Sequence, residues 1–184
     1  WQQSLKKYKI NSAQLLLTLN DSEERRRYLN TRKTITALHN KRVIPIINEN
    51  DTVATEEIRY GDNDRLAARV SQMIGADLLV MLSDIDGLYT ANPYFSKQAK
   101  RVSNIKRIDE LIENMAGKNQ SVFGSGGMQT KIWAAKICLN SGCSTVITNG
   151  QELNPLKAIN QTNSSWFISS ESPNIARKQW LLNH

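Results

Sequence analysis

The sequence predicts an α/β protein built on a mostly parallel sheet. Two observations carry this prediction: short, continuous apolar runs recur along the chain, and most of them are followed by a segment whose apolar residues have helical spacing. Strands that are buried on both faces read as continuous apolar runs, and parallel neighbours need a connecting helix. The length of 184 residues, without repeats or an internal linker, predicts a single domain over 1–184.

Each expected element has a local reason. Leucine-rich or β-branched runs predict strands at 12–19, 43–47, 78–82, 144–148, 166–168 and 179–182, and the last two are expected to finish the fold in antiparallel fashion. Apolar residues at helical spacing predict helices at 21–40, 64–74, 108–115 and 128–140. Asp21 or Ser22 and Asp109 can cap two of the helix starts, and Gly75 and Gly142 mark two of the ends.

Charge and composition narrow the function classes. The net charge is +7, but ten basic and only four acidic residues fall within 1–50. This excess gathers on one expected helix, where only Tyr28 can stack on a base and Glu23 and Glu24 lie among the cations, so a solvated helix face is favoured over nucleic-acid binding. No apolar run is long enough to span a bilayer, and the residues after Trp1 lack the apolar core of a secretory signal. We therefore expect a soluble, cytoplasmic protein.

The two cysteines are expected to be structural. Cys138 and Cys143 are too few for a disulfide framework, and no histidine pair lies near them to complete a zinc site. Both sit in apolar surroundings, which predicts buried free thiols.

Three polar segments follow apolar runs, and ligands of open α/β sheets bind at such strand ends. In the first segment, Glu49 to Asp64, six carboxylates are balanced by Arg59 alone. A cluster of this kind needs a cation, which is either a metal ion or the ammonium group of a substrate. The alternative is a polar surface loop that ends in a helix cap at Asn63.

The second and third segments suit a nucleotide. Ser83 and Asp84 follow a buried strand and can hydrogen-bond a nucleotide, unless they only form a turn. Glycines within 124–127 let backbone N–H groups approach an anion at a helix start, and Lys131 can reach a phosphate from one turn inside. The spacing matches neither the P-loop nor the dinucleotide-binding fingerprint, so a loop that has to bend is the alternative. Together the three segments predict phosphoryl transfer, in which positioning and charge neutralisation supply most of the rate.

Four stretches carry a resemblance to a known family. They read VIPIINENDTVA at 43–54, YGDND at 60–64, LSDIDGLYT at 82–90 and GSGGMQTK at 124–131. In this order they closely resemble the glutamate 5-kinase group of the amino-acid kinase family, which the paired NEND and GDND stretches distinguish from its relatives. The resemblance implies a three-layer αβα sandwich, the amino-acid kinase fold. It also implies that the γ-carboxylate of L-glutamate is phosphorylated by ATP with Mg2+, in the first step of proline biosynthesis.

The same resemblance implies roles for individual residues. Glutamate would be bound by Asp51, Asn63 and Asn48, with the Asp51 carboxylate suited to the α-ammonium group. The residues expected at the nucleotide are Ser83, Asp84, Ser125, Gly126, Gly127, Met128 and Lys131. Lys131 would also stabilise the transferring phosphoryl group, Asp64 would orient the catalytic lysine and the metal environment, and no residue is predicted as a direct metal ligand. The attacking carboxylate is already ionised at neutral pH, so no general base is expected.

The chain departs from the family pattern at several points. Ser83 stands where Thr is usual, and Asn92-Pro93-Tyr94 replaces Asp-Pro-Arg at the edge of the nucleotide site. The opening strand of the family, with its lysine and glycine-rich phosphate loop, and a substrate-binding serine are expected before Trp1. No RNA-binding-like PUA module is expected at the C-terminal end. Partners implied by the resemblance are L-glutamate and ATP, a second copy of the chain in a dimer or tetramer, and proline as a feedback inhibitor.

Other functions stay open from the sequence. Within the same fold, the substrate is alternatively acetylglutamate or a nucleoside monophosphate. A non-catalytic module that binds glutamate or proline is a reading from a different class, and so is an RNA-binding protein that uses the basic face at 25–33.

Overall fold

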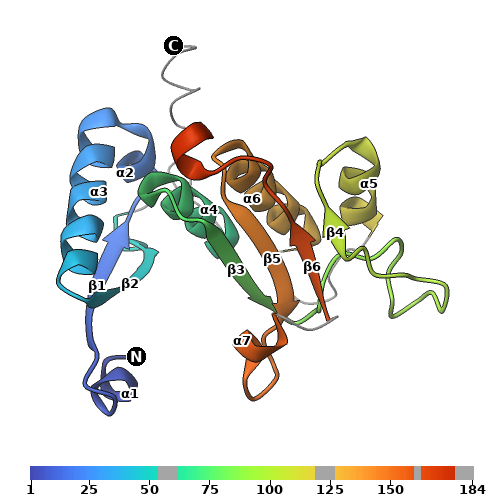
Figure 1. Cartoon of the computed structure of the whole chain (residues 1–184), viewed down its shortest axis with the longest axis horizontal. Coiled ribbons are helices and arrows are strands. Elements are labelled where there is room, and N and C mark those ends of the chain that lie inside the picture. Colours follow the sequence, from blue (N-terminus) through green and yellow to red (C-terminus); the bar gives the residue numbers. More distant parts are fainter. Residues whose placement is uncertain (54–61, 119–126, 160–162, 177–184) are drawn as a thin grey trace. The chain divides into compact units, whose positions relative to one another are not determined.

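The computed structural model describes residues 1–53, 62–118, 127–159 and 163–176 (Figure 1). The chain divides into two compact units, unit 1 (Trp1–Leu66) and unit 2 (Ala67–His184). The elements are α1 (Gln2–Lys6), β1 (Asn11–Leu17), α2 (Asn20–Glu23), α3 (Arg25–Asn40), β2 (Val43–Glu49), α4 (Asn63–Ile74), β3 (Leu78–Ser83), β4 (Asn104–Ile105), α5 (Glu110–Lys118), α6 (Met128–Asn140), β5 (Ser144–Asn149), α7 (Pro155–Ala158) and β6 (Ser164–Phe167).

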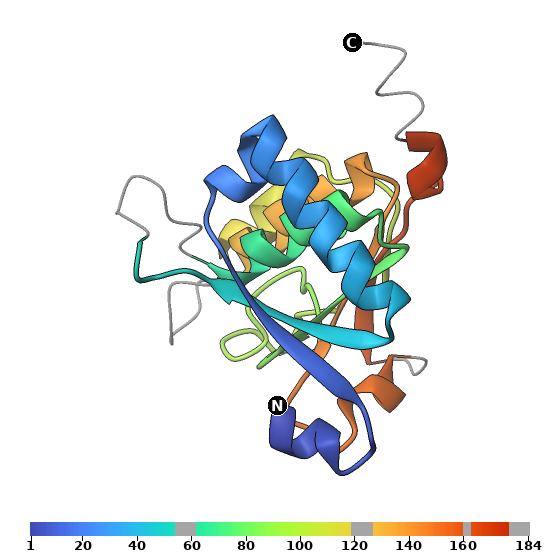
Figure 2. The same cartoon turned by 90° about the vertical axis from the view of Figure 1, so that its left-hand side faces the viewer.

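Unit 1 is built on one parallel strand pair. β1 and β2 pair from Asn11 opposite Val43 to Leu17 opposite Glu49, and α3 connects them and packs beside them (Figure 2). The expected helix over 21–40 is wrong in one respect, because it is broken into α2 and α3 at Glu24, whose backbone is extended.

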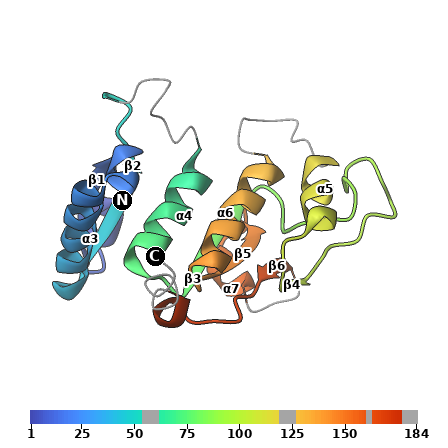
Figure 3. The same ribbon diagram turned by 90° about the horizontal axis from the view of Figure 1, so that it is seen from above.

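Unit 2 contains a four-stranded sheet in the order β3-β5-β6-β4. β3 is parallel to β5 and β4 is parallel to β6, while β5 and β6 are antiparallel. The helices α4, α5 and α6 lie along one face of this sheet (Figure 3). Their apolar residues form a buried cluster with the strands, and its members include Ile132 of α6, Met81, Ile147 and Phe167. The predicted α/β class with a mostly parallel sheet is therefore confirmed.

The corner between α6 and β5 is a Schellman motif. The N–H of Cys143 donates to the carbonyl of Cys138 (2.9 Å), and the N–H of Gly142 donates to the carbonyl of Leu139 (3.1 Å). Gly142 has φ +79°, the left-handed conformation that this motif needs. The motif brings the two cysteines together, and both are buried free thiols as predicted. Their mutual hydrogen bond lowers the pKa of Cys138, whereas the same bond and burial raise the pKa of Cys143.

Most expected elements are present within a few residues of their predicted bounds, and three short ones were missed. The missed elements are α1, β4 and α7, each of two to five residues. The strand expected at 166–168 begins earlier, at Ser164, and is antiparallel to β5. The strand expected at 179–182 lies outside the described residues. Among the helices that the structure describes, none combines the length and apolarity that crossing a membrane demands.

Candidate active site

Chain topology brings two of the predicted segments to the same edge of the unit 2 sheet. A turn of only three residues separates the end of α6 from the start of β5, so α6 runs antiparallel to β5. The first turn of α6 therefore lies at the edge where β5 and its parallel neighbour β3 end. Met128 and Met81, two residues before Ser83, belong to the same buried cluster. Ser83, Asp84 and Lys131 are thus carried by neighbouring elements of one packed unit.

The turn after β3 begins from a fixed position. The Ser83 carbonyl accepts a hydrogen bond from the Gly150 N–H (2.7 Å), and the Ser83 hydroxyl donates to Asp84 Oδ1 (3.0 Å). Ser83 is buried, and the Asp84 side chain faces solvent. A Cβ at Gly150 would lie 2.9 Å from the Cβ of Leu82, so close packing of the two strand ends requires glycine there. Asp84 is therefore presented outward from a rigid strand end.

Asp86 is held by two side chains that the sequence analysis did not identify. Arg101 Nη1 forms an ion pair with Asp86 Oδ2, and the Tyr89 hydroxyl donates to Asp86 Oδ1 (2.8 Å). Burial raises the pKa of Tyr89 above its ordinary value, and its hydrogen bond with Asp86 adds to the rise. The hydroxyl of Tyr89 therefore stays protonated and keeps donating at neutral pH. Arg101 lies 15 residues after Asp86, in a segment rich in lysine and arginine, so the sequence alone gives no sign that these two side chains form an ion pair.

The first turn of α6 is suited to an anion. Gly127 is its N-cap residue, with extended backbone at φ −71° and ψ 178°, and the Thr130 hydroxyl donates to the Gly127 carbonyl (2.8 Å). The turn holds no acidic residue to neutralise the partial positive charge of the helix start. Lys131 is half-buried on the same turn. Backbone N–H groups and a cation therefore combine where the sequence predicts phosphate; Ser125 and Gly126 lie outside the described residues.

The carboxylate-rich segment belongs to unit 1. Asn48 and Asp51 are exposed at the end of β2, where the N–H of Asn50 donates to the carbonyl of Leu17 (2.8 Å) and extends the strand pairing. Residues 54–61, with two of the six carboxylates and Arg59, lie outside the described residues. In the ranges that the structure describes, no three His, Cys, Asp or Glu side chains are grouped so that they could hold a metal ion.

The start of α4 corrects one detail of the sequence analysis. The helix cap considered for Asn63 is supplied by the preceding residue, because Asp62 Oδ1 accepts the N–H of Asp64 (2.6 Å). Asn63 and Asp64 are the first two residues of α4, with Asn63 exposed and Asp64 half-buried. The sequence predicts that the three polar segments converge in one site, with Asp51 and Lys131 on the same side of one cleft; this stays a prediction.

Comparison with known proteins decides the family. Residues 1–149 match the Amino acid kinase family. The chain belongs to the amino acid kinase family. Solved structures support the assignment of the fold. The UMP kinase from Ureaplasma parvum superimposes with a TM-score of 0.59 at 15% sequence identity, and the match covers 91% of this chain and 64% of the UMP kinase chain. The carbamate kinase from Giardia lamblia bound to AMP-PNP has a TM-score of 0.52 at 21% identity, covering 76% of this chain and 44% of its own.

Curated relatives are much more similar in sequence. Over 182 residues, this member of the amino acid kinase family is 59% identical to a glutamate 5-kinase of Agrobacterium fabrum, which covers 98% of the chain and 47% of the relative. It is 53% identical to a glutamate 5-kinase of Paramagnetospirillum magneticum, covering 98% of the chain and 49% of the relative. The chain thus spans about half the length of the curated relatives that it matches. The amino-acid kinase fold expected from the four motifs is confirmed.

Proposed function

We propose that this chain supplies glutamate- and nucleotide-binding parts of a glutamate 5-kinase, which phosphorylates the γ-carboxylate of L-glutamate with Mg-ATP. The observation that carries the proposal is the 59% identity to the Agrobacterium fabrum glutamate 5-kinase over 98% of the chain. The family match runs through both units, from residue 1 to 149, which supports a single kinase domain over 1–184.

In this proposal the nucleotide binds at the edge of unit 2 where β3 ends and α6 begins. Ser83 and Asp84 contact the nucleotide from the end of β3. The N–H groups at the start of α6 hold phosphate oxygens, with Ser125, Gly126, Gly127 and Met128 around them. Lys131 neutralises charge on the transferring phosphoryl group.

Mg2+ is expected to enter with the nucleotide. This ion keeps several water ligands and is usually bound through substrate phosphates and one or two carboxylates. The carboxylate of Asp84, at the same edge of unit 2, is a hard oxygen donor of the kind that Mg2+ accepts. When bound, the ion neutralises charge on the phosphate oxygens. Asp64 orients Lys131 in this proposal.

Glutamate binds through the polar end of β2 and the start of α4 in this proposal. The Asp51 carboxylate faces the α-ammonium group, and the side-chain amides of Asn48 and Asn63 bind the amino acid. An oxygen of the substrate γ-carboxylate forms a bond to the γ-phosphorus of ATP while the bond to the β,γ-bridging oxygen breaks, and ADP leaves. Because the carboxylate is already ionised, no proton has to be removed. The residues of the chain therefore bind, orient and neutralise charge.

Further expectations belong to the same proposal. Proline acts as a feedback inhibitor, the complete protein assembles as a dimer or tetramer, and it works in the cytoplasm in the first step of proline biosynthesis. Inhibition kinetics with proline and light scattering of the purified protein measure the first two expectations.

The direct test is trapping of the acyl phosphate. The complete protein, given L-glutamate, ATP and Mg2+, should form γ-glutamyl hydroxamate in the presence of hydroxylamine. Lys131→Ala should lower turnover by about 100-fold or more, which is typical for loss of one charge-stabilising group. The matched control is Lys136→Ala on the same helix, because Lys136 is exposed and pairs with Glu113 (2.7 Å). Its turnover should equal that of the wild type.

A comparison of substrates separates the proposed function from its alternatives. Acetylglutamate and nucleoside monophosphates should give no phosphorylated product under the same conditions. Turnover of either of them in place of glutamate would overturn the proposed substrate. Calorimetric binding of glutamate or proline without any ATP turnover would instead support a non-catalytic module, and equal turnover of Lys131→Ala and wild type would remove Lys131 from the mechanism.

A further inference from the structure

A short two-stranded arm closes the turn that follows β3. The arm consists of residues 88–90 and 100–102, and two backbone hydrogen bonds of 2.8 and 3.0 Å join its strands, one on each side of the antiparallel pair Tyr89 and Arg101. In a pair of this type the two residues share no backbone hydrogen bond, and their side chains lie close together on one side. Tyr89 and Arg101 both reach Asp86 from this position.

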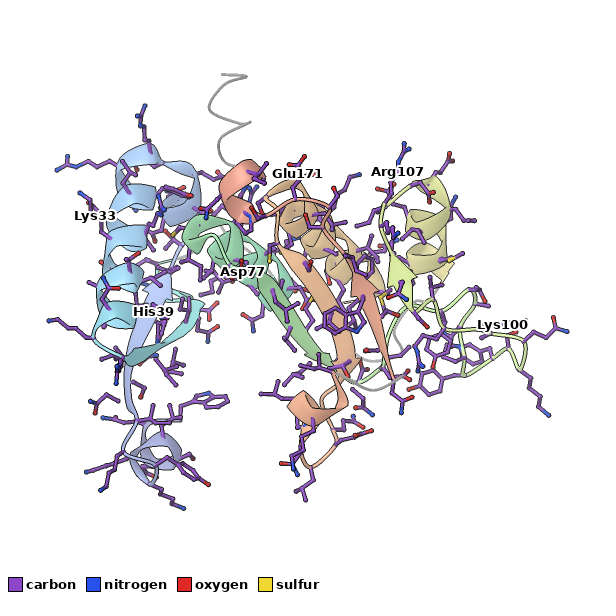
Figure 4. All side chains as sticks on the ribbon, viewed as in Figure 1. Lys33, His39, Asp77, Lys100, Arg107 and Glu171 are labelled. Carbon is purple, nitrogen blue, oxygen red and sulfur yellow. The ribbon has the colours of Figure 1, made fainter. Side chains whose placement is uncertain are left out.

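Arg101 is directed inward, unlike its neighbour. Figure 4 shows Lys100 extending outward from the arm, and successive side chains of a strand point to opposite sides. The side chains of Arg101 and Asp86 are only 19% and 27% exposed, so their ion pair is shielded from water. A charge-assisted pair in such surroundings is stronger than a solvated one and is sensitive to loss of either partner.

A buried serine from β6 completes the arm. The Ser165 hydroxyl accepts the N–H of Leu88 (2.9 Å) and donates to the carbonyl of Val102 (2.6 Å). In a regular antiparallel ladder these two backbone groups would bond directly to each other. The fully buried Ser165 hydroxyl is inserted between them, so β6 anchors both strands of the arm at once.

Gly87 makes this insertion possible. It has φ +150°, and a Cβ there would lie 2.3 Å from the Ser165 oxygen and 3.0 Å from Cδ of Arg101. The backbone of the turn therefore approaches both side chains more closely than any residue with a Cβ allows.

We propose that Arg101 and Ser165 are positioning residues for the nucleotide: they fix the turn 83–87 and thereby the direction of Asp84. The inference rests on the proposed function. Ser83 is held at the upstream end by Gly150, and Asp86 and Gly87 are held downstream, so only Asp84 and Ile85 lie between fixed ends. Ile85 in turn packs on the buried cluster of unit 2. Arg101 and Ser165 act on the nucleotide through the turn and do not touch it.

The first test removes the guanidinium in the complete protein. Arg101→Met should raise the KM for ATP about tenfold and leave kcat and the KM for glutamate near their wild-type values, because a misdirected Asp84 weakens nucleotide binding in the ground state and the transition state alike. Arg101→Lys, which keeps the charge, should recover part of the loss. Asp86→Asn should reproduce the defect, and the double variant should be no worse than either single one, because both remove the same interaction.

The second test removes the inserted hydroxyl. Ser165→Ala should raise the KM for ATP several-fold, because the turn that carries Asp84 loses one of its anchors and nucleotide binding weakens. Ser164→Ala is its matched control, since Ser164 is a buried neighbour on β6 whose hydroxyl has no hydrogen-bond partner within the described part of the chain. Lys100→Met is the control for Arg101→Met, because it removes a cation from the same arm without touching Asp86. Both controls should keep the wild-type KM for ATP.

A uniform loss of activity that tracks a lower melting temperature would overturn the inference, and so would an unchanged KM for ATP in Arg101→Met and Ser165→Ala. Calorimetric titration of the same variants with a non-hydrolysable ATP analogue, without glutamate, measures nucleotide binding by itself. This measurement distinguishes failure of the positioning role from failure of the proposed function. If the wild type binds the analogue but does not phosphorylate glutamate, the proposed function fails while weaker binding by the variants still supports the positioning role.

Discussion

The two units carry their candidate site residues on very different amounts of buried structure. Among the described residues of unit 1, the buried side chains are Leu17, Thr18, Ile35 and Leu66, and its sheet is a single strand pair. In unit 2, four consecutive residues of β5 (145–148) are fully buried within a four-stranded sheet and its helices. A two-stranded sheet is marginal by itself, whereas a larger sheet with a packed face is independently stable.

The difference bears on how each substrate would be recognised. The proposed nucleotide side stands on a core whose side chains and hydrogen bonds fix the turn after β3 from several directions. The proposed glutamate side stands at the end of β2, on a strand pair in which Leu16 and Ile44 are 44% and 40% exposed. Local opening costs least where few apolar contacts are buried. We therefore expect the glutamate side to adapt on binding and the nucleotide side to be preorganised.

The largest effect should come from the same substitution in both regions. Ile147→Ala in β5 should lower the free energy of unfolding by about 4 kcal/mol, because a fully buried side chain leaves a cavity that close-packed neighbours cannot fill. Ile35→Ala, at the buried position of α3, should cost only about 2 kcal/mol, because few other described side chains of unit 1 are buried and the site can relax into the gap. Urea denaturation followed by far-UV circular dichroism measures both values. Equal losses would remove the contrast between the two units.

Regular elements of both regions were predictable from the sequence, because their signals are local. The apolar run of β3 and the helical spacing of α6 each depend on a few consecutive residues, and Asp109 accepts the N–H of Ile112 (3.1 Å) at the predicted helix start. The break at Glu24 was not predictable from periodicity. Before the break, the Asp21 carboxylate accepts both the N–H and the hydroxyl of Thr18 (2.7 and 2.8 Å) at the start of the short helix α2.

The residues of the candidate site also fall into those that the sequence predicted and those that it did not. Ser83, Asp84 and Lys131 were found because they follow or begin strongly patterned elements. Arg101 and Ser165 were missed, because their hydrogen bonds are to residues far away in the sequence. Arg101 bonds to Asp86, 15 positions away, and Ser165 bonds to Leu88, 77 positions away. A serine in a four-residue strand carries no sign that its hydroxyl bridges two other backbone segments.

A second prediction tests the rigidity of unit 2 at the corner between α6 and β5. Gly142→Ala should destabilise the protein by about 2–3 kcal/mol, because φ is +79° and the new Cβ would lie 2.6 Å from the backbone carbonyl carbon of Ser172. Neighbouring backbone cannot move aside as a flexible side chain can. Thermal unfolding monitored by calorimetry measures the loss.

Gly117 supplies the matched control for this corner. It lies in α5, and among the described residues its added Cβ would meet only the end of the Gln129 side chain at 3.3 Å. Gly117→Ala should therefore leave stability unchanged or raise it by up to about 1 kcal/mol through better helix propensity. A loss at Gly117 as large as that at Gly142 would show that backbone conformation and close packing do not explain the corner.

The smallest expected effect concerns Tyr89 and is best seen through pH. Tyr89→Phe removes one hydrogen bond to Asp86 and should cost about 1 kcal/mol at neutral pH. The pKa of Tyr89 is raised above its ordinary value of 10.0 by burial and by Asp86, so the folded protein holds this proton more tightly than the unfolded chain does. The resulting stability is fully present below pH 10 and is lost as pH rises through the higher folded pKa. Melting temperatures measured from neutral to strongly alkaline pH should thus fall more steeply above pH 10 in the wild type than in Tyr89→Phe. Parallel curves for the two proteins would mean that the folded structure does not perturb the pKa of the Tyr89 hydroxyl.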